Sequence, residues 1–175
     1  MKSALKIAAG LGAVSALSGL ASTAYAQSSA SATATGSATI LQSISVTASS
    51  NLGFGTIVKP SSGTSTISVS TAGSRSINGG NAVIANTSGV SAASFLVQGE
   101  GGSAISVSVP PTFSMAAGTN TLVVTTTSTT TAGNLTGGIG TQGSFTVGVG
   151  GSFPLQSTTA SGAYSGNLVV TAQYN

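Results

Sequence analysis

The chain of 175 residues contains no cysteine and no histidine, and only five of its side chains are charged at neutral pH, four Lys or Arg and one acid. Without cysteine there is no disulfide framework, so stability has to come from apolar burial. Zinc sites built from His or Cys are excluded, and a calcium site would consist almost wholly of neutral oxygens. The composition therefore predicts no metal and no cofactor.

The composition offers few side chains that could act as an acid, a base or an activated nucleophile. Glu100 is the only carboxylate side chain, whereas a glycosidase needs two, and a Ser or Thr nucleophile would have only Lys59 or Glu100 as its base. Gly138, Gly140 and Gly143 match the glycine spacing of dinucleotide-binding loops, but a β-like run follows them in place of the required helix. We expect a protein that is not an enzyme, with a glycine-rich loop here.

The first residues have the pattern of an export signal. Lys2 and Lys6 precede an apolar run, Ile7 to Leu20, that is too short and too interrupted to span a bilayer, and Ala24-Tyr25-Ala26 resembles a signal-peptidase site. We interpret residues 1–26 as a cleaved signal peptide, so that no membrane span remains in the exported chain. Cleavage would also leave too few basic residues to bind nucleic acid, and Lys59 and Arg75 are expected to be solvated charges in turns.

The remaining chain has the pattern of an all-β protein. Short runs of β-branched and aromatic residues recur between clusters of Gly, Ser and Asn, and Asn-Gly or Gly-Gly pairs mark tight turns. Residues 38–175 are therefore expected to form an immunoglobulin-like or Greek-key β-sandwich of short antiparallel strands. The expected strands are 38–48, 54–58, 64–70, 81–86, 93–98, 104–109, 120–127, 143–149, 152–156 and 163–174.

The last of these strands has one apolar face. Its even positions carry Tyr164, Leu168, Val170, Ala172 and Tyr174, whereas its odd positions are mostly polar. Since side chains alternate across a strand, the even positions are expected to face the core. The Tyr164 hydroxyl has a second possible role, which is to anchor a loop as in a tyrosine corner.

Small residues alternate in the segment before the sandwich. Ala30, Ala32, Ala34, Ala38 and Ile40 share one parity, and Ser or Thr occupies most of the other. This pattern is typical of an extended strand, whereas the composition is typical of a flexible linker. Residues 27–37 are therefore either a flexible tether or a strand that completes another sheet.

The C-terminal stretch resembles the last strand of pilus subunits assembled by the chaperone–usher route. That family has a penultimate Tyr and a Gly fourteen residues from the end, which Tyr174 and Gly162 match here. The resemblance implies that residues 28–40, with Gly36 among them, form a donor strand that completes a neighbouring copy. It also implies other copies of the chain, a periplasmic chaperone and an outer-membrane usher as partners, and passage through the periplasm to a fibre at the cell surface or outside the cell.

Four further motifs resemble, in order, those of a bacterial family of exported domains of unknown function that are reminiscent of fimbrial subunits. These motifs are Asn51–Ile57, Ala93–Gly99, Gly143–Gly151 and Gly162–Gly166. The resemblance implies the same all-β fold and export.

The expected function is therefore that of a pilin-like structural subunit that polymerises by strand exchange. One alternative is a self-complete monomeric binding module or adhesin, which would need a groove lined by exposed aromatic residues. Another is a surface-layer or matrix protein, which would assemble through its faces.

Overall fold

The computed structural model of the chain describes residues 29–175, so the expected signal peptide lies outside the described residues. The chain divides into two compact units, Met1–Ala38 and Thr39–Asn175. Residues 29–38 of the first unit are exposed and form no strand. The second unit is all-β, with twelve strands and no helix within residues 39–175, and the all-β prediction is confirmed. Within the described part of the chain, no helix is long and apolar enough to cross a membrane.

The strands form three antiparallel sheets. A seven-stranded sheet has the order β1-β6-β11-β3-β4, with β9 paired to β11 and β8 paired to β9. A three-stranded sheet has the order β10-β7-β12, and β2 and β5 form a two-stranded sheet. The strands are β1 Ser45–Ser50, β2 Gly53–Val58, β3 Thr64–Val69, β4 Arg75–Asn78, β5 Val83–Ser91, β6 Ala93–Glu100, β7 Ala104–Ser108, β8 Thr112–Ala117, β9 Asn120–Ser128, β10 Ala132–Asn134, β11 Gln142–Gln156 and β12 Thr171–Tyr174.

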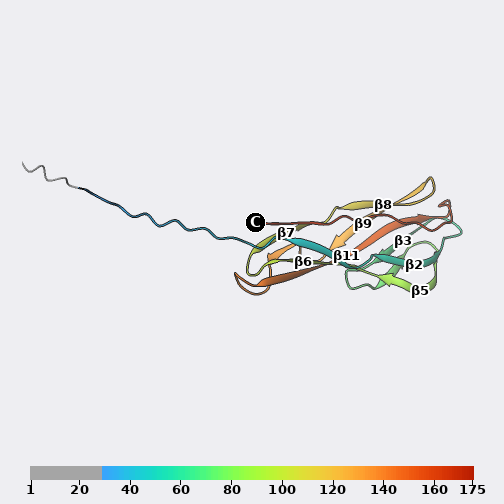
Figure 1. Cartoon of the computed structure of the whole chain (residues 1–175). Coiled ribbons are helices and arrows are strands. Elements are labelled where there is room, and N and C mark those ends of the chain that lie inside the picture. Colours follow the sequence, from blue (N-terminus) through green and yellow to red (C-terminus); the bar gives the residue numbers. More distant parts are fainter. Residues whose placement is uncertain (1–28) are drawn as a thin grey trace, which may run out of the picture. The chain divides into compact units, whose positions relative to one another are not determined.

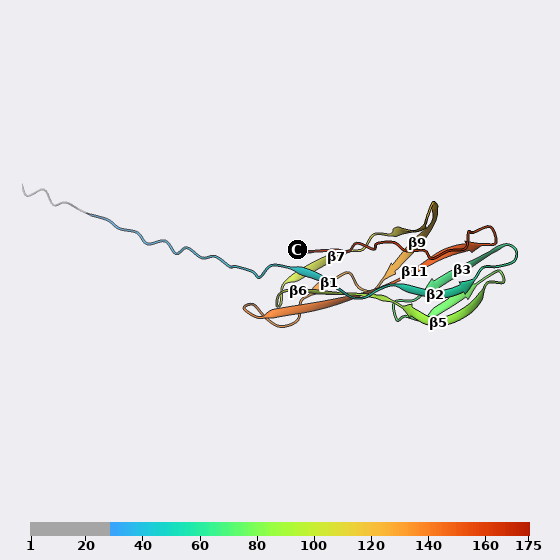
Figure 2. The same cartoon turned by 45° about the vertical axis from the view of Figure 1, so that its right-hand side comes forward.

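Strand β11 connects the two ends of the second unit, as both views show (Figures 1 and 2). It pairs with β6 from Gln142 to Val149, with β9 at its centre, and with β3 from Gly151 to Gln156. The sequence predicts two strands here, 143–149 and 152–156, with Gly150 and Gly151 between them. The glycines instead allow close packing, since a Cβ on Gly150 would collide with the Val69 carbonyl oxygen.

Two apolar clusters lie along β11. The first lies between β6, β11 and β7 and contains Phe95, Val97, Ile105, Val107, Leu135, Val147 and Val149 with Ala93. The second lies between β2, β3, β8, β9 and the end of β11 and contains Phe54, Ile67, Val69, Met115, Val124, Phe153 and Leu155. Alternating residues of β3, β6, β7 and β11 supply most of this core, as a period of two requires.

Several predicted strand boundaries are wrong. The first strand begins at Ser45 and not at residue 38, and strands β4, β8 and β10 were not expected. The last strand is confined to Thr171–Tyr174, with one isolated bridge between Ser165 and Ala116 upstream of it. Short polar strands such as β4 and β10 are set by their neighbours in the sheet and not by their own apolar pattern.

Candidate functional site

An apolar groove lies between β2 and the segment Thr159–Tyr164. Its volume is about 830 Å³. Side chains of the second cluster form its floor, and Phe54 packs edge-to-face on Phe153 there, with ring centroids 5.0 Å apart and an interplanar angle of 82°. Ile57, Leu122 and Tyr164 are half-buried around it. The groove therefore opens onto the core of this part of the molecule.

One wall of the groove is a strand with a free edge. Among residues 29–175, β2 pairs only with β5, so no strand is paired with its other edge. Lys59, which follows β2, donates a hydrogen bond from Nζ to the carbonyl oxygen of Thr159 at 3.1 Å. Both residues line the groove, so this bond links its two walls at one place.

The other wall, Thr159–Tyr164, includes the start of the C-terminal stretch Gly162–Asn175, and the predicted apolar face of this stretch is confirmed. Leu168, Val170, Ala172 and Tyr174 pack on the first cluster, and Tyr164 packs on the second. Gly162 lines the groove, where a Cβ would come within 3.1 Å of the Ala117 side chain. The Tyr164 hydroxyl also donates to the carbonyl oxygen of Ala160 at 2.9 Å, as the tyrosine-corner alternative requires.

This C-terminal stretch is hydrogen-bonded along one side. Strand β12 is antiparallel to β7, and the Asn175 amide donates to the Ala104 carbonyl oxygen at 3.0 Å. Since backbone groups alternate in direction, those of Thr171 and Gln173 also face β7, whereas those of Ala172 face away from it. Strand β12 is thus the edge of its sheet in the structure described.

A second edge strand lies near β12. Strand β1 pairs only with β6 among the described strands, and Ile44 and Val46 pack on the same first cluster as the even residues of the C-terminal stretch. Strands β1 and β12 are therefore two edge strands of the described structure that lie beside the first cluster.

A network that the sequence did not predict fixes the start of the second unit. The backbone amide of Gln42 donates to Glu100 Oε2 at 3.1 Å, and the Tyr174 hydroxyl donates to the backbone carbonyl oxygen of Gln42 at 2.8 Å. The Glu100 amide donates to the Tyr174 hydroxyl oxygen at 2.7 Å, and the Gly140 amide donates to Glu100 Oε1. We call Gln42, Glu100 and Tyr174 the Gln42 clamp. The one signal for it in the sequence is that Glu100 is the only acid.

The expected donor residues lie before this clamp. Ala30, Ala32, Ala34, Gly36 and Ala38 belong to the first unit, where they are exposed and outside any strand. Ile40 belongs to the second unit, and 90% of its surface is exposed. Of the C-terminal residues of the expected site, Gly162 and Tyr164 line the groove, whereas Leu168, Val170, Ala172 and Tyr174 pack on the first cluster. The N-terminal residues of the expected site are exposed within the described part of the chain.

The prediction for Arg75 is wrong. Its guanidinium is half-buried, and it donates from Nη1 to the Phe54 carbonyl oxygen at 2.5 Å and from Nη2 to the Asn86 carbonyl oxygen at 2.8 Å. Arg75 thereby joins β4 to both strands of the β2–β5 sheet, next to two irregularities in their register. The sequence could not reveal this, because β4 itself was not expected.

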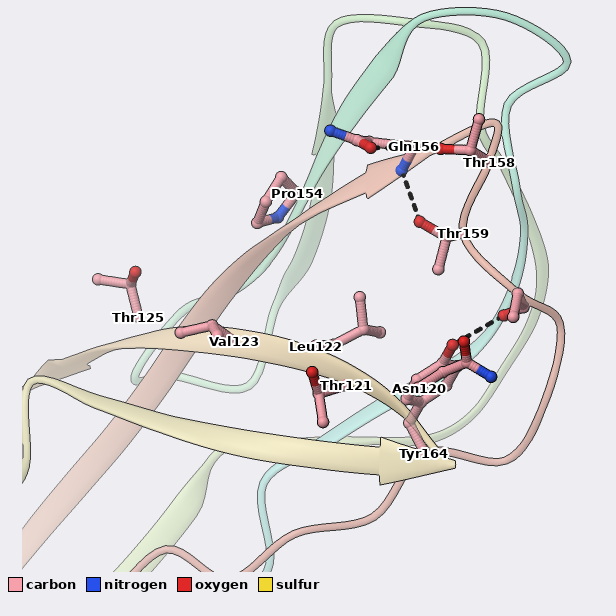
Figure 3. A pocket seen from close by; sticks show the side chains of 11 residues that line it. Asn120, Thr121, Leu122, Val123, Thr125, Pro154, Gln156, Thr158, Thr159 and Tyr164 are labelled. Carbon is pink, nitrogen blue, oxygen red and sulfur yellow. Dashed lines mark hydrogen bonds between the residues drawn. The ribbon is translucent and has the colours of Figure 1, made fainter. Parts of the chain in front are cut away.

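A polar hollow adjoins the groove (Figure 3). It has a volume of about 580 Å³ and contains no charged side chain among its lining residues. Side-chain hydroxyl and amide groups from β9, the end of β11 and the following turn line it. The backbone amide of Gln156 donates to Thr159 Oγ1 at 3.1 Å. Leu122, Thr159, Ala160 and Tyr164 line both this hollow and the apolar groove. Such a lining has hydrogen-bonding capacity but no acid or base.

Comparison with known proteins gives a family for most of the chain. Neither the curated proteins nor the solved structures contain a match to it. The family model described as a domain of unknown function (DUF4402) matches residues 44–174, which include every strand described above. The chain belongs to this family.

Proposed function

We propose that this protein is a structural subunit that joins other copies of itself by strand insertion. In this proposal an extended segment of one copy enters the groove of the next copy and pairs with its free edges. The observation that carries the proposal is the groove of about 830 Å³, which opens onto a core cluster between β2 and Thr159–Tyr164. Chains that pair in this way take affinity from backbone hydrogen bonds and specificity from alternate side chains.

The acceptor side of this proposal rests on two properties of the groove and of the C-terminal stretch, whose residues Leu168 and Ala172 lie outside the groove lining. The free edge of β2 and the outward backbone groups of Ala172 supply donors and acceptors for an added strand. Half-buried side chains such as Ile57 and Leu168 supply apolar surface that an added strand would cover. An inserted segment would thus satisfy both kinds of group.

The donor side rests on the segment before β1. Residues 29–40 are exposed, uncharged and outside any strand, and their small apolar residues alternate with Ser and Thr. Residues 28–40 of another copy are therefore the proposed donor strand. Export as a precursor with residues 1–26 removed, help from a periplasmic chaperone and an outer-membrane usher, and a surface fibre as the product belong to the same proposal.

Deletion of residues 28–40 from protein that begins at Gln27 tests this function by electron microscopy. We expect fibres from the intact protein and none from the deletion variant. The deletion removes none of the hydrogen bonds described above, and circular dichroism should show the same strand content. A variant with residues 28–40 scrambled so that the alternation is lost is the matched control for length and composition. Fibres of normal length from the deletion variant would refute donor-strand assembly.

The polar hollow favours a second candidate, a self-complete module that binds a neutral polar ligand such as a saccharide. Uncharged hydroxyl and amide groups surround the half-buried Tyr164 there. Size-exclusion chromatography with and without a peptide that copies residues 27–40 separates the two candidates. A stable monomer whose elution does not change when the peptide is added supports the binding module.

A further inference from the structure

An inserted strand needs a side chain that fills the apolar groove and so anchors the strand there. The proposed donor segment consists largely of alanine on its apolar parity, and a methyl group covers little surface. The groove floor, by contrast, contains Phe54, Met115 and Phe153. A larger side chain is therefore needed if insertion is to cover this floor.

Ile40 is the one large residue on that parity. It is 90% exposed, whereas the neighbouring Leu41, on the opposite parity, is 44% exposed. In an extended segment that places the alanines toward the groove, Ile40 also faces the groove and Leu41 faces away from it. Parity therefore predicts that Ile40 faces the groove and that Leu41, which is of similar size, does not.

The Gln42 clamp prevents Ile40 from reaching the groove of its own chain. The clamp lies at the end of β11 where Gln142 pairs with Glu100, whereas Phe153 and Leu155 line the groove near the other end. This separation is on the order of 35 Å at 3.3 Å per residue of strand. Ile40 lies only two residues before Gln42, which allows a reach of about 7 Å.

We propose that Ile40 of a second copy occupies the apolar groove, and that the Gln42 clamp presents Ile40 for this contact. This inference rests on the proposed function and names the anchor of the same site. The contact joins two different surfaces, the clamp end of one copy and the groove of the next. Repetition of such a head-to-tail contact makes a ring or an open chain of copies and not a pair joined through the same surface on both.

Because the chain has no cysteine, pairs of single-cysteine variants test the contact directly. Ile40→Cys in isotope-labelled protein is mixed with Ile57→Cys in unlabelled protein, and mass spectrometry identifies mixed disulfides after mild oxidation. We expect the mixed disulfide from this pair and at least tenfold less from Leu41→Cys with Ile57→Cys. Val83→Cys, on exposed β5 and outside the groove lining, is the control for random collision.

Alanine variants give a second readout. Ile40→Ala should lower the affinity of the 27–42 peptide for protein lacking residues 28–40 by about tenfold or more, whereas Leu41→Ala should change it by less than about twofold. Equal effects of the two variants, or a mixed disulfide from Ala32→Cys in place of Ile40→Cys, would overturn the assignment of Ile40 but leave strand insertion intact. If the 27–42 peptide does not bind, no cysteine pair forms a mixed disulfide and no fibres form, the proposed function itself fails.

Discussion

The hydroxyl of Tyr174 donates to the carbonyl oxygen of Gln42 at 2.8 Å, across 132 positions of the chain. The same hydroxyl accepts the Glu100 amide at 2.7 Å. One side chain near the C-terminus therefore holds both the start of the second unit and the end of β6. The absence of a Cβ on Gly99 makes room for this hydroxyl, since a Cβ there would collide with it.

Replacement of Tyr174 by Phe should destabilise the second unit by about 1–3 kcal/mol, because the Glu100 amide then lacks its acceptor and the Gln42 carbonyl lacks its donor. Urea unfolding followed by circular dichroism measures the change. Tyr164→Phe, which removes one bond to Ala160, is the matched control and should cost less. Equal costs for the two variants would contradict the clamp.

Replacement of Glu100 by Gln should also weaken the clamp. Glu100 is 2% exposed and uses both carboxylate oxygens, one for Gln42 and one for Gly140, whereas Gln has a single acceptor oxygen. We expect a cost of about 1–3 kcal/mol. Amide hydrogen exchange should become faster at Gln42 or Gly140, while amides at the centre of β11 change little at early times. Unchanged exchange at both amides would show that the carboxylate is dispensable.

Replacement of Arg75 by Lys should loosen the β2–β5 sheet. The guanidinium binds two carbonyl oxygens at once, and an ammonium on a flexible stem does not reproduce this fork. We expect a loss of about 1–2 kcal/mol in the free energy of unfolding. Lys59→Arg is the control, since Lys59 is exposed and makes a single bond to Thr159, and it should change stability by less than about 0.5 kcal/mol.

Replacement of Gly150 by Ala should cost about 1–3 kcal/mol, because the added methyl group collides with backbone atoms of Val69 and Ser70 that cannot move independently of the sheet. Thermal unfolding gives the comparison. Gly138→Ala is the control, since no atom lies within 4 Å of its added Cβ, and it should leave stability unchanged or raise it by up to about 1 kcal/mol. A tolerated Gly150→Ala would mean that β11 and β3 pack less closely than described.

The sequence predicts the parts of this structure that depend on alternation. The apolar positions of β3, β6, β7 and β11 alternate in the sequence and lie in the two clusters, and the even face of the C-terminal stretch packs on the same clusters, as its parity predicts. Periodicity does not predict β4 or β10, because their residues do not alternate clearly and neighbouring strands hold them. The expected interruption at Gly150 and Gly151 is wrong, because glycine inside a strand pattern can also mark a close approach of neighbouring strands.

The candidate site is predicted only in part. The parity of Tyr164, Leu168 and Val170 predicts their apolar face, whereas the groove between Thr159–Tyr164 and β2 requires knowledge of which strands are neighbours. The roles of Glu100 and Arg75 depend on contacts with residues 58 and 21 positions away, respectively, and no local pattern encodes such contacts. The rarity of charged residues marks both side chains as unusual but does not say what they bind.

Strand β11 contributes Val147 and Val149 to the first cluster and Phe153 and Leu155 to the second. The ladders of β11 with β6, β9 and β3 follow one another along this one strand, so that loss of strand order at one cluster also disturbs the strand on which the other cluster packs. The two halves of the second unit should therefore unfold together, in a single cooperative transition with coincident curves from near-UV and far-UV circular dichroism.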